Sequence, residues 1–213
     1  GETSFYFKEG LTWSTLATSL SVRYCPKGFV FDTKGSMCFP EKKETIYYLE
    51  ALLNSKVASY VMDFLSPTLD YNQGAMGKIP VDVSEKIFDR ITELSKQNIS
   101  IAKKDWDSFE TSWNFKRHYL VKEGHQLSEI YSVWQQECED RYITLKKNEE
   151  EINSLFIELY GLEGELTSEV EEKYISITRA DKQRDIKSLI SYIVGCIMGR
   201  YSYQKDGLVI ASK

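Results

Sequence analysis

The spacing of hydrophobic and polar residues differs between two parts of this chain, and it changes near residue 83. In the first part, Leu20, Val22 and Tyr24 alternate with polar neighbours, which is typical of a half-buried strand. In the second part, apolar residues recur at spacings of three and four, which is typical of helices that lie on a core. The pattern predicts an α+β protein, in which a small mixed α/β portion at 1–83 is followed by a mainly helical region at 84–213.

The first portion contains turn and strand signals that predict a small sheet. Proline and glycine mark the turns, and short apolar runs lie between them. The expected order is a turn at 26–28, a strand at 29–31, a second turn at 32–35 and a return strand at 37–39.

One amphipathic helix is expected after this sheet. Its apolar positions are Ile46, Leu49, Leu53, Val57, Tyr60, Val61 and Phe64. It should end at Ser66, because the following proline disfavours a helical residue before it. Residues 70–80 contain two glycines and are expected to form a loop.

The second part predicts three helices. The first runs from Ser84, a candidate N-cap, to Asn98. The second is a rod from Leu127 to Tyr160, roughly 50 Å long at 1.5 Å per residue, stopped by Gly161. The third spans 181–201 and is so widely apolar that we expect a core helix.

The rod carries a heptad seam at Tyr131, Cys138, Leu145, Ile152 and Leu159, which Arg141 and Asn148 interrupt. Asn148 could instead cap a second helix, since three glutamates follow it. The rod is then either continuous or two helices with a kink at this residue.

An aromatic-rich stretch at 105–115 is too polar between its rings for a buried helix, so we expect it to wrap over a neighbour. For three of the four tryptophans, Trp106, Trp113 and Trp134, packing is the expected role.

Composition narrows the class of protein. With 213 residues, a net charge of −5 and 42% hydrophobic residues, the chain is neither disordered nor a uniformly basic nucleic-acid binder. No apolar run reaches the ~20 residues that span a bilayer. The four cysteines (25, 38, 138 and 196) lack the close spacing of a zinc site and are expected to be free thiols in a reducing, cytoplasmic compartment.

The chain shows no complete catalytic or cofactor motif. Neither of its two histidines, His118 and His125, lies near a Gly-x-Ser-x-Gly turn, and no GxxxxGK[ST] or GxGxxG loop is present. The many neighbouring acidic residues are expected to lie on the solvated surface. We therefore expect no catalytic, cofactor-binding or metal-binding residues.

Two basic sets could contact nucleic acid. The first comprises Arg23, Lys27 and Lys34, with Asn72 and Gln73 further along the chain as amides that could pair with adenine edges. The second comprises basic residues that alternate with aspartates, so ion pairs at i,i+4 explain them equally well. Its members are Arg179, Lys182, Arg184 and Lys187.

Four long segments resemble the large adenine-specific DNA methyltransferases of BREX phage-defence systems. Three of them lie in the helical region: DWDSFETSWNFKRH (105–118), NEEEINSLFIELYGLEGELTSEV (148–170) and RADKQRDIKSLISYIVGCIMGRYS (179–202). The fourth, LLNSKVASYVMDFLSPTLDYNQGAMGKIPV (52–81), looks like the end of the target-recognition domain of these and related restriction-modification enzymes.

The resemblance implies methyl transfer from S-adenosylmethionine to adenine N6 in double-stranded DNA. That reaction uses an [ND]PP[YF] motif and a glycine-rich loop, and this chain has no Pro-Pro pair. We therefore expect a fragment of such an enzyme without its catalytic domain or cofactor, comprising the C-terminal part of a target-recognition domain (1–83) and a helical scaffold domain (84–213). The DNA-facing residues would be Arg23, Lys27, Lys34, Asn72 and Gln73.

A helical protein-interaction module is the alternative. The interrupted heptad and the acidic surface would then dock other defence-system subunits, and the chain could self-associate. The sequence leaves the oligomeric state open.

Overall fold

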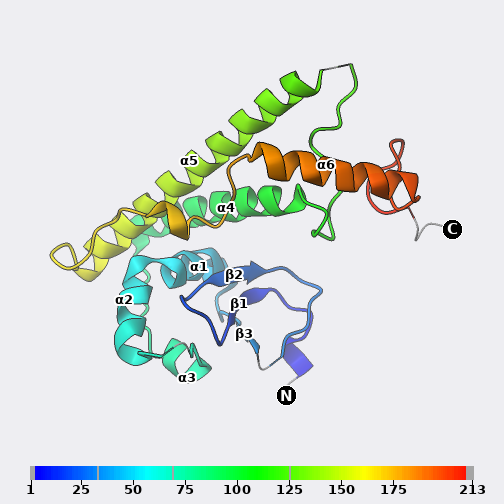
Figure 1. Cartoon of the computed structure of the whole chain (residues 1–213). Coiled ribbons are helices and arrows are strands. Elements are labelled where there is room, and N and C mark those ends of the chain that lie inside the picture. The colour runs from blue at the N-terminus through cyan, green and yellow to red at the C-terminus, as the bar shows by residue number, and fades with distance from the viewer. Residues whose placement is uncertain (1–2, 33, 69, 125, 210–213) are drawn as a thin grey trace. The chain divides into compact units, whose positions relative to one another are not determined.

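The computed structural model describes residues 3–32, 34–68, 70–124 and 126–209 (Figure 1). The chain divides into two compact units. Unit 1 comprises Gly1–Ile99 and Lys147–Val170, and unit 2 comprises Ser100–Lys146 and Glu171–Lys213. The expected domain boundary near residue 83 stays a prediction.

The predicted α+β fold is confirmed, with the strands confined to unit 1. Strand β1 (Gly10–Ser14) lies between β2 (Val22–Cys25) and β3 (Gly35–Cys38), and both pairs are antiparallel. Leu11 and Trp13 of β1 pair with neighbours across the sheet and lie buried in the core. This central strand was not among the elements expected from the sequence, although its residues alternate as a half-buried strand should.

The expected strand at 29–31 is wrong, and β3 pairs with β1 instead. Residues 29–31 follow an irregular path in which Phe29 and Val30 are more than half exposed. This path is tied to the chain before β1, because the Phe7 amide donates to the Phe29 carbonyl at 2.9 Å and the Gly28 amide donates to the Phe7 carbonyl at 3.1 Å. Three apolar residues in a row therefore mark an exposed loop and not a strand.

The single helix expected after residue 40 is two helices, α1 (Ile46–Asn54) and α2 (Lys56–Leu65), after the short turn η2 (Lys43–Thr45). The break lies at Ser55, whose backbone is extended and whose hydroxyl accepts from the Ala58 amide at 3.3 Å. The expected end before Ser66 is confirmed. The predicted loop at 70–80 contains a one-turn helix, α3 (Gln73–Met76).

Helix α5 (Leu127–Tyr160) confirms the predicted rod, including both of its ends. Gly161 adopts a positive φ of 65°, and the Leu162 amide donates to the Ile157 carbonyl at 2.9 Å, which closes the last turn. The alternative of a kink at Asn148 is wrong. Its buried side chain donates from inside the helix to Gln97 and Asn98 of α4 (Glu85–Asp107), at 3.2 and 2.9 Å.

Two clusters of apolar side chains form the core of unit 1. One lies under the sheet and includes Leu11, Val22 and Met62. The other joins α1, α4 and α5 around the fully buried Tyr48 and Phe156, whose rings meet edge-on with centroids 5.3 Å apart. Leu145 and Ile152, two of the heptad positions, lie buried in cores of this chain and are therefore already packed.

Unit 2 contains the turn η3 (Glu172–Tyr174) and the helix α6 (Lys182–Ile197), which is capped by the Asp181 carboxylate. The expectation of a core helix is wrong for α6. Its fully buried residues are Asp185 and Tyr192. Much of its apolar arc faces away from its neighbours and is 46–79% exposed, at Ile190, Ile193, Val194, Ile197 and Met198.

The tryptophans divide into two groups. Trp134 is buried and packs as expected, but Trp106 is 58% exposed and Trp113 is 97% exposed. The expected packing role is therefore wrong for these two. Among the described residues, no helix is long and apolar enough to cross a bilayer.

Candidate nucleic-acid interface

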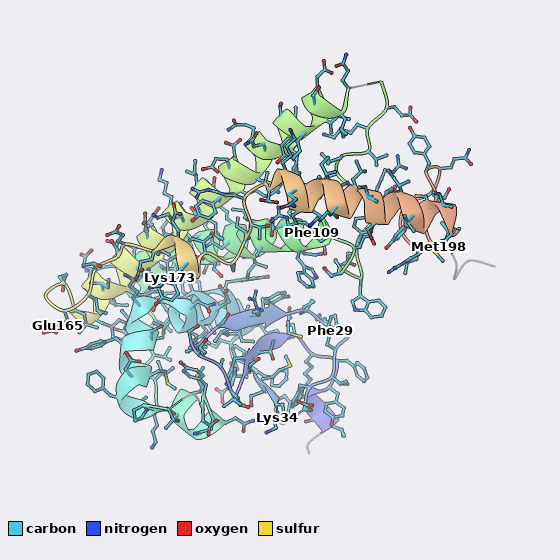
Figure 2. The ribbon with its side chains drawn as sticks, viewed as in Figure 1. Phe29, Lys34, Phe109, Glu165, Lys173 and Met198 are labelled. Atoms are coloured by element: carbon cyan, nitrogen blue, oxygen red, sulfur yellow. The ribbon has the colours of Figure 1, made fainter. Side chains whose placement is uncertain are left out.

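The five residues Arg23, Lys27, Lys34, Asn72 and Gln73, here called the recognition set, all lie on unit 1 and are all exposed. Arg23 lies on β2, Lys27 in the turn after it, and Lys34 immediately before β3. The two amides lie at the start of α3. Figure 2 shows Lys34 and Phe29 on the connection between β2 and β3.

The connection between β2 and β3 is shaped by the Asp32 side chain. Its Oδ1 accepts from the Lys34 and Gly35 amides at 2.8 and 2.9 Å. These two backbone hydrogen bonds, from Gly35 and Lys34, lower the pKa of Asp32. Lys27 and Lys34 form no ion pair with any residue that the structure describes, although the charges of Asp32 and Lys34 act on one another, so this loop presents two exposed cations beside the exposed Phe29.

Arg23 is partly compensated. It is paired in register with Thr12 across β1 and β2, on the face of the sheet opposite the core residues Leu11 and Val22. Its positive charge acts on the Glu50 carboxylate and lowers the pKa of that group against the larger effect of burial. Arg23 therefore has an acidic neighbour in its own unit, which weakens its availability to DNA.

The two amides of the recognition set, Asn72 and Gln73, both form hydrogen bonds within unit 1. Asn72 caps α3 by accepting from the Ala75 amide at 3.0 Å, and Gln73 donates to the Ser36 hydroxyl at 3.3 Å. A bidentate contact to adenine needs both the oxygen and the nitrogen of one amide. The Gln73 interaction is long, so Gln73 is the better placed of the two. The N-cap preference of asparagine could have revealed the role of Asn72.

Two half-buried carboxyls of unit 1, Glu50 and Glu149, have raised pKa values. Glu50 accepts from the Ser95 hydroxyl at 2.7 Å and from the Asn54 amide at 2.8 Å. Burial raises the pKa of Glu50 to about 7. Burial, together with the charges of Glu50 and Glu150, raises the pKa of Glu149 to about 7.

We expect these carboxyls to make unit 1 less stable as the pH rises from about 4.5 to 7. In that range the folded protein keeps protons that the unfolded chain, with an ordinary glutamate pKa near 4.5, has already lost. Glu50→Gln removes one such charge and should raise the free energy of unfolding by about 1–3 kcal/mol at pH 8, with little gain at pH 4. Urea unfolding across this pH range measures the effect. The exposed Glu163→Gln is the control, and an identical pH dependence of both variants would contradict the prediction.

Two of the four residues of the second basic set, Arg179 and Arg184, form ion pairs. Arg179 contacts Glu139 at 3.0 Å and Glu172 at 3.3 Å, and Arg184 contacts Asp185 at 2.8 Å. None of these pairs has the i,i+4 spacing expected from the sequence, because the arginines pair with other elements or with an adjacent residue.

His118 also has a structural environment. It is buried, its Nε2 lies 3.2 Å from the Ser188 hydroxyl, and its ring stacks on Tyr119. Burial lowers the pKa of His118 to about 4, so the imidazole is neutral at pH 7.

Comparison with known proteins supplies the family. The chain matches no family model. It is 41% identical over 214 aligned positions to the adenine-specific methyltransferase PglX of Lacticaseibacillus casei, and 35% identical over 227 positions to the adenine-specific methyltransferase BrxX of Escherichia coli O9:H4. Each match covers 97% of this chain but 18% of the relative. The resemblance found in the sequence is therefore confirmed, and this chain is related along nearly its whole length to one segment of the PglX and BrxX adenine-specific methyltransferases.

Proposed function

We propose that this chain is the DNA target-recognition and helical scaffold region of a site-specific adenine-N6 DNA methyltransferase of a phage-defence system. The observation that carries the proposal is the similarity to PglX and BrxX over 97% of the chain, in a segment that lacks the [ND]PP[YF] motif of adenine methylation. The chemistry on S-adenosylmethionine would then belong to other parts of the enzyme.

The loop between β2 and β3 supports a role in DNA contact. Its lysines, Lys27 and Lys34, are exposed and form no ion pair among the described residues, and Asp32 accepts hydrogen bonds from the Lys34 and Gly35 amides. Exposed lysines can contact phosphates, which position a protein on the duplex. Gln73, which is linked to β3 through Ser36, would read a base edge.

Substitution of the two loop lysines tests this role. We expect Lys27→Ala with Lys34→Ala to weaken binding to a 30-base-pair duplex at least about tenfold at low salt, measured by fluorescence anisotropy. The slope of log affinity against log salt should fall by about two, because each lost phosphate contact contributes about 0.9.

The matched control removes two exposed lysines elsewhere in unit 1, by Lys43→Ala with Lys86→Ala. It should leave the salt slope within the error of the wild type. If both double variants bind the duplex alike, the loop lysines do not contact DNA.

Docking of a protein partner is a second candidate function, favoured by the exposed apolar arc of α6. Five apolar residues lie on this arc, and Figure 2 marks one of them, Met198, beyond the end of the helix. Apolar patches on soluble proteins often mark interaction sites. Light scattering distinguishes the candidates: a dimer abolished by Ile193→Glu with Ile197→Glu would favour docking, and a strict monomer would weaken it.

A further inference from the structure

Unit 2 contains a basic cleft of about 500 Å³. The residues that line it belong neither to the recognition set nor to the second basic set. The end of α4 forms one wall, and the segment after it forms the other. Four cationic side chains and one carboxylate line the cleft, which is bounded by Lys103, Lys104, Asp107, Ser108, Asn114, Lys116, Arg117 and Tyr119.

The single carboxylate that lines the basic cleft already has partners within the chain. Asp107 pairs with Lys103 and accepts from the Ser112 hydroxyl at 2.6 Å. Although burial acts to raise it, the pKa of Asp107 is lowered by these hydrogen bonds from Lys103 and Ser112. The remaining three cations therefore dominate the electrostatics of the cleft.

Two of these cations are free, and the third is only partly satisfied. The exposed Lys104 and Lys116 form no ion pair within the parts of the chain that the structure describes. Arg117 reaches Asp206 at 3.3 Å, but its buried Nε has no hydrogen-bond partner among the described residues. The buried Arg117 Nε is out of reach of a ligand, but a cleft with two unpaired lysines suits an anion that accepts several hydrogen bonds, such as a phosphodiester.

The backbone around the basic cleft is held in place. The Ser108 hydroxyl donates to the Lys104 carbonyl at 2.8 Å, and the Gly207 amide donates to the Lys116 carbonyl at 2.8 Å. Phe115 anchors the segment between them, because its ring is buried against Tyr192 and Tyr201 with centroids 5.8 and 5.5 Å away. The lysines are thus presented from a fixed scaffold.

Trp113 is a second candidate binding element, although it lines a smaller hollow next along the chain and not the basic cleft itself. It lies next to the cleft residue Asn114 and is 97% exposed, although the ring-rich core of unit 2 begins two residues later at Phe115. The smaller hollow has a volume of about 120 Å³ and contains Arg200. An exposed indole beside unpaired cations is the combination with which proteins hold single strands, since the ring stacks on a base while cations follow the backbone.

We propose that the basic cleft binds the phosphate backbone of single-stranded or locally unpaired DNA, and that Trp113 stacks on an unpaired base. A base inside a duplex offers no free face to the ring, so the stacking partner must be unpaired. This surface is separate from the recognition set and needs none of its residues.

The test uses the 213-residue chain with a 20-nucleotide single strand and a duplex of the same sequence, compared by fluorescence anisotropy. Lys104→Glu with Lys116→Glu should weaken single-strand binding more than about tenfold and lower its salt slope by about 1.4, at roughly 0.7 per phosphate. Trp113→Ala should weaken single-strand binding about 5- to 100-fold and duplex binding less than about twofold.

Matched controls separate these effects from charge and surface changes. Lys122→Glu with Lys173→Glu makes the same charge change elsewhere in unit 2, and Phe64→Ala removes another exposed ring. Neither should lower single-strand affinity more than about twofold. Single-strand binding that is absent in the wild type, or equal in wild type, cleft and Trp113 variants, overturns the proposal.

The same titrations distinguish this proposal from the proposed function. Loss of duplex binding in the Lys27 and Lys34 variant, with normal single-strand binding in the cleft variants, supports the recognition set and overturns the cleft. The opposite result supports the cleft and overturns the role of the loop lysines.

Discussion

Asp185→Ala is expected to lower the free energy of unfolding by about 3–5 kcal/mol. The Asp185 carboxylate is completely buried. One of its oxygens accepts from Arg184 Nε at 2.9 Å, and the other accepts from Trp134 Nε1 at 3.2 Å and the Asp181 amide at 3.1 Å. Removing the carboxylate leaves the buried Trp134 indole N–H without an acceptor, and a buried unsatisfied donor costs about 1–3 kcal/mol, while Arg184 and the Asp181 amide lose their shared partner.

The loss should extend to the aromatic packing of unit 2. Trp134 stacks on Tyr119 with ring centroids 3.6 Å apart, and Tyr119 in turn stacks on His118. Asp185 fixes the edge of this stack through the indole N–H. Urea unfolding at pH 7, followed by tryptophan fluorescence, measures the change.

Asp140→Ala provides the control for this measurement. Asp140 is exposed on α5 and accepts a hydrogen bond from Gln136 on the same helix. Its replacement should change the free energy of unfolding by less than about 0.5 kcal/mol. Equal midpoints for the two alanine variants would show that Asp185 does not hold unit 2 together.

Helix α5 was the most predictable element of this fold. Both ends of α5 follow from local signals, since its apolar spacing is helical and Gly161 adopts the positive φ that ends it. The sheet was less predictable because its pairing is not local. The phenylalanine-rich run at 29–31 has the composition of a strand, yet β1, which comes earlier in the chain, is the partner of β3.

The solvent exposure of apolar side chains was the main feature that could not be predicted from residue type. Apolar residues at helical spacing predicted a buried α6, but the number of neighbours around a helix is set by the fold and not by its own sequence. Trp113 illustrates the same limit, because a tryptophan is expected to pack. The candidate interfaces therefore depend on exposed loops and one exposed ring, which only the structure could identify.

The second large effect concerns sequence selectivity. Phosphate contacts such as those proposed for Lys27 and Lys34 give affinity without sequence information, whereas base-edge contacts such as that proposed for Gln73 select a sequence. Specific sites are typically bound at least about 10³-fold more tightly than other DNA. Changing all five residues of the recognition set to alanine should therefore abolish selectivity as well as weaken binding.

Gln73→Ala alone should act on one base pair. Loss of a bidentate contact costs about 1–3 kcal/mol of discrimination, so the preference at that position should relax while the rest of the recognised sequence persists. Gln97→Ala, at an exposed glutamine of α4 in the same unit, is the matched control and should leave every position unchanged.

Selection from a pool of random 30-base-pair duplexes tests most directly whether this chain reads DNA. The wild-type chain should enrich a short common sequence over successive rounds, and the variant with alanine at Arg23, Lys27, Lys34, Asn72 and Gln73 should recover none. Recovery of the same sequence by both proteins, or of no common sequence by the wild type, would contradict the account.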